Sequence, residues 1–579
     1  MKSFNELKKN IKKDRSHLKT VKIAILGDSA IQLLVQAIKG YGHDIGYNFD
    51  IWEADYDQID RLVLDTSSEF YQFNPEFVVI FHSSHKLLSK FYRLDNDGKS
   101  VFARRHIEHV ATLYQTITDK LAGKVVLLNY PEINDSIFGN YANKTDLSFV
   151  YQLRSINVEL MNLARKFSGL FIVDLCLQQG HCGAGFMTDR KVFINTDILF
   201  SMDFLPLAAK NIVDVVISVM GNLKKCIILD LDNTVWGGVI GDDGIENIQI
   251  GDLGIGKAFT EFQWWLKQLK QRGIILAVCS KNDENIAREP FAKHPDMVLK
   301  IEDISIFVAN WENKAVNIKY IQGILNIGFD SMVFLDDSPF ERNMVRTCIP
   351  EIAVPELPED PAEYLPFLRS LNLFETASFT PEDGQRTEQY QQEAKRAFIL
   401  EQSTNEDDFL GALGMICEVQ AFDKFNTPRV AQLTQRSNQF NLRTVRYTDE
   451  DIRRLAERPD VLTFAFSLLD RFGSYGLISA VVLEKRSKVL FIDTWIMSCR
   501  VLKRGMEMFV LNTLVRAARR AGCTEIRGEY LPTLKNGMVK DHYKNLGFRL
   551  EPGKDNFWCL MVNDYQDNRT YIALKEQGA

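Results

Sequence analysis

Two aspartates one residue apart, Asp230 and Asp232, follow an apolar run in the stretch CIILDLDNTVWGGVIGDDG, which extends from Cys226 to Gly244. Alternate side chains of a strand lie on one face, so both carboxylates are expected to point the same way at the strand's end. Carboxylates this close repel each other unless a cation or a shared proton relieves them. Carboxylate oxygens are ligands that suit Mg²⁺, so the pair predicts a magnesium site.

Three further polar pieces occur in order along the chain. Ser280 ends an apolar run, Lys314 lies in WENKAVNI, and the pair Asp336-Asp337 ends another apolar run. In order and spacing, these pieces resemble the four motifs of the haloacid dehalogenase (HAD) superfamily of phosphotransferases, over about residues 223–354. A strand end with an Asx turn is the alternative interpretation of DLDNT, and we disfavour it because all four motifs are in register.

The HAD resemblance implies a role for each residue. Asp230 would attack phosphorus, and Asp232 would act as general acid and base while its backbone carbonyl helps to hold Mg²⁺. Lys314 would neutralise the growing charge, and Asp336 would complete the metal site of Asp230 and Asp232. The sequence does not decide whether Asp337 is a metal ligand or a hydrogen-bond acceptor behind a ligand. Phosphoryl transfer depends mainly on such positioning and charge neutralisation. The residues implied to bind the phosphate oxygens are Thr234, Ser280 and Asn282.

These residues need strands to position them, and the chain supplies short apolar runs separated by helical stretches. In a second domain, predicted over residues 223–378, the runs KKCIILDLD, GIILAVCSKN and SMVFLDDSP end in the polar pieces. A parallel α/β sheet brings the carboxyl ends of its strands, where ligands bind, to one edge. The proline-rich stretch PELPEDPAEYLPF after Val354 is expected to be a loop or linker.

The flanking regions have patterns of their own. Residues 1–222 contain VKIAILG, EFVVIFHSS, KVVLLNYP and GLFIVDLC, which predict another parallel α/β domain. Residues 379–579 contain strand-like runs between Val461 and Met497 and then a helix from near Arg504, which predicts an antiparallel α+β domain. A chain of 579 residues is too long for one core, so three domains is the natural division.

Composition excludes several classes of protein. Hydrophobic residues make up 46% and charged residues 25%, and the net charge of −7 argues against broad nucleic-acid binding, which needs a basic face. No stretch approaches the roughly 20 apolar residues that span a bilayer, and the basic N-terminus lacks the apolar run of a signal peptide. The nine cysteines include no C-x-x-C pair, so we expect a cytoplasmic protein with reduced thiols.

Gly237 and Gly238 turn the chain directly after the aspartates, where many HAD enzymes carry a cap domain. Only about 25 residues separate Asp232 from the helix predicted in KAFTEFQWWLKQLKQ, too few for a folded cap. An open site suits a large substrate, such as a group carried on a protein. A small open phosphatase with a small substrate is the alternative.

Taken together, DLDNTVWGGVIGDDG, VCSKND, FLDDSPFER, LTQRSNQFNLRT and WIMSCRVLKRGME resemble the FkbH-like proteins, HAD-type enzymes associated with polyketide assembly. The resemblance implies an SGNH-like domain over 1–222, a HAD-like Rossmannoid domain over 223–378 and an N-acetyltransferase-like (GNAT-like) domain over 379–579. The implied activity is Mg²⁺-dependent dephosphorylation of 1,3-bisphosphoglycerate, with transfer of the glyceryl group to the phosphopantetheine thiol of an acyl carrier protein. The expected partners are that carrier and a phosphorylated three-carbon substrate, with no nucleic acid and no membrane; the substrate rests on family analogy.

Thioester formation needs a thiol, because a thiolate attacks the acyl carbon of an acyl phosphate. Cys279 adjoins Ser280, and Cys499 lies at the end of a strand in the third domain. Either could carry the acyl group, although cysteine is also common in packed cores. Alternation turns Cys279 away from the site if Ser280 faces it, and we favour Cys279 on proximity alone.

The first domain contains GDS, which ends in Ser29 and resembles the nucleophile block of SGNH hydrolases. A catalytic serine needs a base, yet the segment where these enzymes carry Asp-x-x-His is here DFLP, residues 203–206. His82, His85 and His181 could substitute but lack the expected context. We therefore favour a non-catalytic first domain that serves docking or support.

The third domain ends with KDHYKNLGF, similar to the closing motif of GNAT folds. Its turn CRVLKRGME resembles their pyrophosphate loop, where backbone N–H groups at a helix start hold phosphate. The usual loop is richer in glycine, whereas here Gly505 stands beside Arg500, Lys503 and Arg504. We expect Arg500, Arg504 and Gly505 to bind the phosphopantetheine arm of a carrier; a solvated basic turn is the alternative.

Three other functions stay open. One is a HAD phosphatase on another substrate that needs no thiol acceptor. A second is a GNAT-type acyltransferase on an amine, whose donor the HAD site prepares. The third is a binding scaffold with inert sites, which the intact HAD motifs disfavour.

Overall fold

The chain forms two compact units, Met1–Val219 and Met220–Ala579. The structure is a computed structural model that describes residues 2–402, 406–502, 504–533 and 535–575. Across these ranges no helix has both the length and the apolar character needed to cross a membrane.

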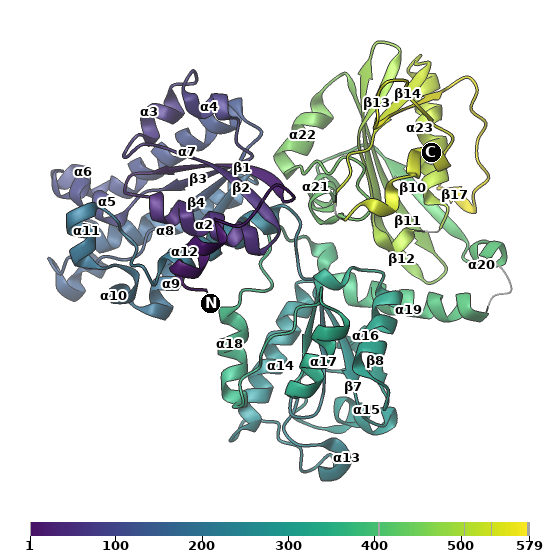
Figure 1. Ribbon diagram of the computed structural model, residues 1–579, viewed down its shortest axis with the longest axis horizontal. Coiled ribbons are helices and arrows are strands. Elements are labelled where there is room, and N and C mark those ends of the chain that lie inside the picture. The colour runs from purple at the N-terminus through teal and green to yellow at the C-terminus, as the bar shows by residue number, and fades with distance from the viewer. Residues whose placement is uncertain (1, 403–405, 503, 534, 576–579) are drawn as a thin grey trace. The chain divides into compact units, whose positions relative to one another are not determined.

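The first unit is built on a five-stranded parallel sheet in the order β2-β1-β3-β4-β5 (Figure 1). Its strands are β1 (Lys19–Gly27), β2 (Tyr47–Glu53), β3 (Phe77–Phe81), β4 (Lys124–Leu128) and β5 (Leu170–Val173). Its longer helices are α2 (Gln32–Asp44), α7 (Phe102–Lys120), α8 (Phe149–Lys166) and α12 (Leu205–Val219). The shorter ones are α1 (Phe4–Asn10), α3 (Ile59–Leu64), α4 (Glu69–Phe73), α5 (Ser84–Tyr92), α6 (Asn96–Ser100), α9 (Leu175–Cys182), α10 (Ala184–Met187) and α11 (Arg190–Thr196). Ala24 and Leu26 of β1 pack against α7 and α8, while α2 packs on α12. The predicted parallel α/β architecture is confirmed here, since continuous apolar strands need cover on both faces.

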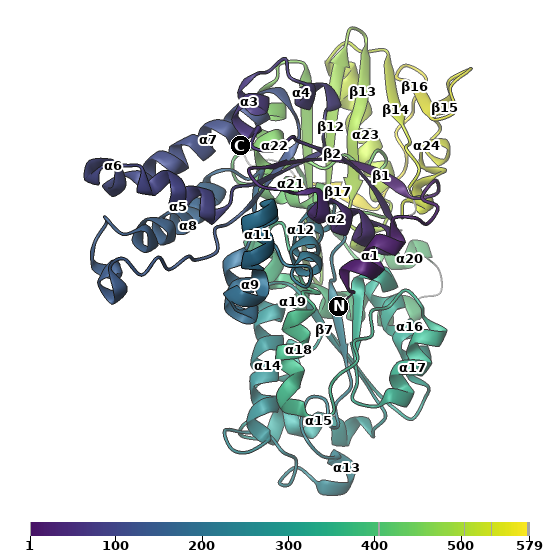
Figure 2. The same cartoon turned by 60° about the vertical axis from the view of Figure 1, so that its left-hand side comes forward.

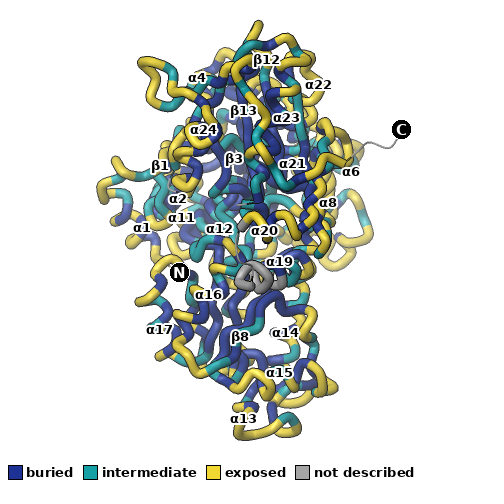
Figure 3. The backbone as a smooth tube through the Cα atoms, turned by 90° about the vertical axis from the view of Figure 1, so that its right-hand side faces the viewer, coloured by how far each residue is buried: buried dark blue, intermediate teal, exposed yellow. Residues whose placement is uncertain are grey.

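The second unit contains two sheets, the first of which has four parallel strands in the order β8-β7-β6-β9. These strands are β6 (Cys226–Leu229), β7 (Ile275–Ser280), β8 (Ile306–Ala309) and β9 (Met332–Leu335). The helices of this four-stranded part are α13 (Ile240–Asp243), α14 (Gly256–Gln271), α15 (Glu284–Lys293), α16 (Lys314–Leu325), α17 (Pro339–Cys348) and α18 (Tyr364–Ser370). The tube in Figure 3 is dark blue along the strands and yellow around α13, so the core follows the sheet and α13 lies at the surface.

The alternation of side chains along the four strands produces two separate cores. Ile227, Leu229 and Leu335 lie on the face that α14 and α18 cover. Ile228 and Phe334, one residue away in each strand, lie on the opposite face beneath α16 and α17. Side chains of one strand therefore reach opposite layers, as the period of two requires.

Only the first half of the stretch PELPEDPAEYLPF, residues 355–360, is the predicted loop. Its second half begins α18, and the Tyr364 ring lies 6.3 Å from the Phe259 ring and 6.5 Å from the Phe262 ring of α14 (centroid to centroid). The prolines misled the prediction, because Pro361 begins a 3₁₀ turn (Pro361–Glu363) directly before the helix instead of ending an element.

The second sheet of this unit has eight strands in the order β15-β16-β14-β13-β12-β11-β10-β17 (Figure 2). Its strands are β10 (Met415–Gln420), β11 (Val461–Asp470), β12 (Gly473–Arg486), β13 (Val489–Met497), β14 (Glu525–Glu529), β15 (Arg549–Leu550), β16 (Phe557–Met561) and β17 (Ile572–Leu574). The helices of this eight-stranded part are α19 (Arg386–Gln402), α20 (Glu406–Ala412), α21 (Thr427–Arg436), α22 (Asp449–Glu457), α23 (Met506–Arg520) and α24 (His542–Asn545). As predicted, β11, β12 and β13 are antiparallel, while β13 and β14 are parallel and α23 connects them. The two compact units meet at residues 219/220. The border predicted at 378/379, between the second and third domains, stays a prediction.

Candidate active site

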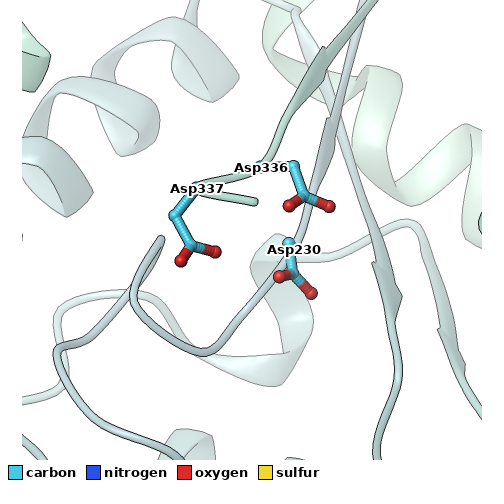
Figure 4. Close-up of side chains that lie close together, drawn as sticks. All are labelled: Asp230, Asp336 and Asp337. Carbon is cyan, nitrogen blue, oxygen red and sulfur yellow. The ribbon is translucent and has the colours of Figure 1, made fainter. Parts of the chain in front are cut away.

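Three carboxylates meet at the carboxyl ends of two neighbouring strands, β6 and β9. Asp230 follows β6, and its backbone N–H donates to Leu335 O at 3.0 Å, which brings the ends of the two strands together. Asp336 and Asp337 follow β9, and one oxygen from each of the three carboxylates lies within 4.8 Å of the others (Figure 4). Asp336 is fully buried and Asp230 is 7% exposed. Their mutual repulsion requires cations.

Lys314 supplies one of these cations. Its Nζ lies 3.0 Å from Asp230 Oδ1 and 2.6 Å from Asp336 Oδ2, at the start of α16, where Asn313 caps the helix by accepting from Ala315 N. Burial lowers the pKa of Lys314, but Asp230 and Asp336 outweigh that effect and raise it. Burial, followed by repulsion from Asp230, raises the pKa of Asp336 to about 7.

The donor set fits a divalent cation. Three ionised carboxylates against one ammonium leave a formal charge of −2, and all the available ligand atoms are hard oxygens. Asp230, Asp336 and Asp337 can therefore hold Mg²⁺. The position of Asp337 in the cluster makes it a candidate ligand beside Asp230 and Asp336.

Asp232 lies apart from this cluster. Its Oδ1 accepts from Trp236 Nε1 and Ile240 N, both at 3.0 Å, and its Oδ2 accepts from Asn282 Nδ2 at 2.9 Å. The strand β6 ends at Leu229, so Asp232 lies in the turn that follows the strand rather than on the strand itself. Three donors fix its carboxylate beside the metal-ligand set, a position that suits a proton donor and acceptor.

The two glycines after the aspartates form the turn that orients Asp232. Gly237 pairs with Gln249 through two backbone hydrogen bonds, and Gly238 has φ +93°, a conformation that side chains disfavour. Gly238 N donates to Asn233 Oδ1 at 2.9 Å. A Cβ on Gly238 would lie 2.6 Å from Asp243 Oδ2, the oxygen that accepts from the N–H of residue 239. The turn brings the N–H of residue 240 back onto Asp232.

The structure distributes the three predicted phosphate-binding residues differently. Ser280 and Asn282 lie next to Asp232, since Asn282 Nδ2 contacts both Asp232 and, at 3.3 Å, Ser280 Oγ. Thr234 is fully buried, and its Oγ1 accepts from Asp337 N at 3.1 Å. Thr234 therefore ties the turn after β6 to the loop after β9, and the prediction that it binds phosphate is not supported by its position.

Arg342 is a site residue that the sequence analysis missed. Its guanidinium donates to Asp336 O at 2.8 Å and Asp337 O at 2.6 Å from within α17. Ser338 caps that helix and its N–H donates to Asp336 Oδ1 at 2.9 Å. The only sequence signal is an arginine six residues after Asp336, on the first turns of the following helix.

Cys279 lies on the wrong face of the sheet for catalysis. Its side chain is fully buried beneath α16, and its Sγ lies 3.7 Å from Lys314 O. Burial raises the pKa of this thiol to about 12. The prediction that Cys279 is a nucleophile is therefore wrong on geometry: Ser280 takes the site face, so the preceding residue faces the core.

Cys499 lies at the other end of the four-stranded sheet. It follows β13, packs partly buried against the α16 face, and lines a cavity together with Lys225. Lys225 precedes β6 and Asp230 follows it, so about 16 Å of extended chain separates them at ~3.3 Å per residue. Cys499 therefore lies away from the carboxylate site.

The predicted carrier-arm residues do not converge on one point. Arg500 is buried and bonds to Gln389 Oε1 and to Ser498 Oγ, in the cavity that Cys499 lines. Arg504 instead pairs with Glu393 at 2.7 Å. Gly505 begins α23 with φ +74° and has open space where a Cβ would lie. Lys503, beside them in the sequence, lies outside the described residues.

Ser29 of the first unit has no catalytic partner among the described residues. Its hydroxyl is buried and forms no hydrogen bond, while Asp28 accepts from Ser83 N at 2.9 Å. His82 is buried, which lowers its pKa to about 4, and its ring packs on His106. His85 packs on Phe193, and His181 is exposed on α9. These contacts favour a supporting role for this domain.

Comparisons with known proteins match long parts of this chain. The family model described as "FkbH, N-terminal domain" matches residues 22–217. The N-terminal part of the protein BF1531 from Bacteroides fragilis, which contains a phosphatase domain and was solved with Mg, is 53% identical with a TM-score of 0.63. That match covers 66% of this chain and 100% of the other. No curated protein matches the sequence.

Two acetyltransferase structures give much weaker matches. The ribosomal-protein-S18-alanine N-acetyltransferase from Escherichia coli is 13% identical with a TM-score of 0.21, covering 27% of this chain and 99% of its own. A putative GNAT-family acetyltransferase from Desulfovibrio desulfuricans is 11% identical with a TM-score of 0.22. That match covers 26% of this chain and 99% of the other. Similarities of this size carry no argument about function.

Substitution at Gly238 tests the role of the turn. Gly238→Ala must place its Cβ against Asp243, which displaces the backbone N–H that holds Asp232. We expect phosphate release to fall by about tenfold or more, because a misplaced general acid loses most of its contribution. Steady-state assays with a phosphate monoester measure this, and Gly241→Ala is the matched control, since a Cβ there meets open space. Equal activity of the two variants would contradict the proposed role of the turn.

Ser29 offers a test of the first unit. Ser29→Ala removes a hydroxyl that has no partner, so we expect carrier loading and phosphate release to stay within experimental scatter. Hydrolysis of p-nitrophenyl acetate by the unmodified chain should be no faster than the buffer background. Loss of loading in a folded variant, or esterase activity that disappears with the hydroxyl, would assign this domain a catalytic serine.

Proposed function

This chain belongs to the FkbH-like family, and we propose that it dephosphorylates 1,3-bisphosphoglycerate and transfers the glyceryl group to an acyl carrier protein thiol for polyketide-type biosynthesis. At 53% identity to a Mg-bound phosphatase domain, the chain is a Mg²⁺-dependent enzyme with phosphatase activity. The substrate and the carrier are the parts that we propose.

The observation that carries the phosphatase chemistry is the division of labour among the carboxylates. Asp230, Asp336 and Asp337 form one cluster, in which Lys314 pairs with Asp230 and Asp336, whereas Asp232 is held separately by three N–H donors. When bound to the cluster, Mg²⁺ supplies positive charge beside the phosphate oxygens. The separate position of Asp232 leaves it free to exchange a proton with the leaving group.

The proposed steps use this chain's own residues. Lys314 holds Asp230 Oδ1 at 3.0 Å, which orients the carboxylate to form a bond to the phosphorus of the phosphate ester as the P–O bond to the glyceryl oxygen breaks. The acyl phosphate of the same substrate stays intact, so that a thiol can later attack its acyl carbon and release the second phosphate. The leaving oxygen takes a proton from Asp232. Asp232, now ionised, takes a proton from a water that attacks the phosphorus of the aspartyl phosphate. The bond from phosphorus to Asp230 breaks, which releases inorganic phosphate and restores the Asp230 carboxylate and the protonated Asp232.

The surroundings of the site support a large substrate. The segment between Asp232 and α14 contains only the four-residue helix α13, so no folded cap covers the carboxylates. Trp311, in the loop after β8, is 75% exposed, and Phe340, in the first turn of α17, is 71% exposed. Exposed aromatic side chains near the ends of the site strands favour docking of a protein.

Cys499 is the thiol that the geometry favours for acyl transfer. It is partly exposed in a cavity, whereas Cys279 is sealed in the core. Because Cys499 lies at the opposite end of β6 from Asp230, phosphate removal and acyl transfer would occur at two separate places. A carrier-bound arm that moves between them would suit this separation.

Loss of the Asp230 charge should stop the phosphatase reaction. We expect Asp230→Asn to lower phosphate release by about a thousandfold or more, because both the nucleophile and a metal ligand are lost. The exposed Asp242→Asn in α13 is the matched control and should retain activity. EDTA should abolish release by the unmodified chain, and added Mg²⁺ should restore it. A folded Asp230→Asn variant with near-normal release would exclude this site.

Carrier loading separates the two thiols and tests the proposed substrate. Intact-mass analysis would follow a phosphopantetheinylated carrier incubated with enzyme, Mg²⁺ and 1,3-bisphosphoglycerate, and we expect a glyceryl adduct on the carrier. Cys499→Ala should abolish that adduct, while Cys279→Ala should retain it, since its thiol only packs. Phosphate release without any carrier adduct would favour a phosphatase that needs no thiol acceptor. Loading that survives Cys499→Ala would indicate direct attack by the carrier thiol.

A further inference from the structure

A cavity of about 490 Å³ lies between the amino-terminal ends of the four strands and the eight-stranded part, within the second unit. Lys225 before β6 and the loop before β9 form one wall. α19, α21 and the end of β13 form the others. This cation-rich cavity is at the opposite end of β6 from the carboxylate cluster. It is large enough for a small ligand, since such pockets measure about 300–1,000 Å³.

The lining is strongly basic. Six cationic side chains contribute to it: Lys225, Arg386, Arg429, Arg436, Arg500 and Lys535. Among the described residues, the carboxylates that line the cavity or pair with these cations are Asp383, Asp330 and Glu351. Asp383 alone is shared by three arginines, with Arg386 at 2.8 Å and Arg429 at 3.8 Å. Positive charge therefore exceeds negative charge around this space.

Several of these cations are removed from water without full compensation. Arg429 is 8% exposed, and its Nε has no hydrogen-bond partner. The Nε of Arg436 also has no hydrogen-bond partner. Lys225 donates to a backbone carbonyl, Arg436 O, at 3.0 Å. Burial lowers the pKa of Lys225 to about 8, and burial with repulsion from Arg386 lowers that of Arg436 to about 9. Buried charges of one sign are costly unless a counterion joins them.

The chemistry of the lining selects the ligand. Guanidinium groups match the oxygens of a phosphate in paired hydrogen bonds, and a phosphate carries enough charge to offset the excess. Ser498 and Asn438 add uncharged hydrogen-bonding groups, whereas Phe440 and Met497 offer an apolar side for a short carbon chain. We propose that the cation-rich cavity binds the phosphate group of a small phosphorylated ligand directly, without a metal, as a second phosphate site separate from Asp230.

The location of Cys499 indicates which reaction a phosphorylated ligand in this cavity could serve. Cys499 lines the same cavity, and its carbonyl accepts from Asn326 Nδ2 at 2.9 Å, which anchors the turn to the end of α16. An acyl phosphate held by the arginines would present its acyl carbon within the space that this thiol faces. That identification of the ligand as the acyl donor rests on the proposed function, whereas binding of a phosphate group does not.

Protection of Cys499 from alkylation tests the proposal on the unmodified full chain. With EDTA present to silence the carboxylate site, iodoacetamide labelling would be followed by peptide mass analysis as inorganic phosphate or glycerol 3-phosphate is added. We expect labelling of Cys499 to slow by about tenfold at ten times the dissociation constant, as mass action requires. The exposed Cys348 in α17, outside the cavity, is the internal control and should show no change.

Charge variants then connect the protection to the arginines. Arg429→Gln should weaken phosphate binding by about tenfold or more, and Arg429→Lys should retain part of it. The surface variant Arg516→Gln, whose side chain pairs with Asp567, should bind as the unmodified chain does. The proposal would be overturned if potassium chloride at the same ionic strength slowed the labelling of Cys499 equally. It would also be overturned if 10 mM phosphate (~10⁻² M, a weak-site limit) gave no protection of Cys499. Neither readout uses carrier loading or phosphatase turnover, so failure of the proposed function would leave them unaffected.

Discussion

The ion cluster around Lys314 is the constraint on which the site depends. Lys314 is 3% exposed, and its ammonium lies between Asp230 and Asp336, so it offsets the repulsion between two buried carboxylates. A buried ion pair contributes little net stability, but removal of one partner leaves an uncompensated charge. The parallel sheet makes the cluster possible, because it brings the ends of β6 and β9 together while α16 directs Lys314 into the gap. The remaining negative charge then requires a metal cation.

Much of this arrangement could be predicted from sequence, because it depends on strand ends. Apolar runs that stop at Asp230, Ser280 and Asp336 place polar side chains at one edge of any parallel sheet. The lysine, Lys314, was identified through the resemblance to the HAD motifs. The phosphatase-domain structure that is 53% identical to this chain agrees with the chemistry that these motifs predict.

The parts that could not be predicted depend on tertiary contacts. The carboxylate of Asp232 is oriented by a turn that returns eight residues later, which no local rule specifies. Thr234 resembles a phosphate ligand in sequence, yet its hydroxyl holds a neighbouring loop. Alternation correctly turned Cys279 away from the site, and the preference for it failed because proximity along the chain was given more weight than the direction of the side chain. The high proline content likewise led the prediction to miss the helix α18.

One consequence of α18 concerns how the protein can be divided for study. Tyr364 donates from its hydroxyl to Asn233 O at 3.2 Å, and the Arg272 guanidinium at the end of α14 donates to Phe374 O at 2.5 Å. A fragment that ends at the proline-rich stretch would therefore lose the cover of α14 and a contact to the aspartate turn. A fragment that ends after Phe374 would keep both, but it would lose Asp383, whose backbone lies against Gly273. The natural unit for expression is thus longer than the sequence motifs suggest, and a cut between the two sheets of the second unit would remove contacts from the four-stranded part.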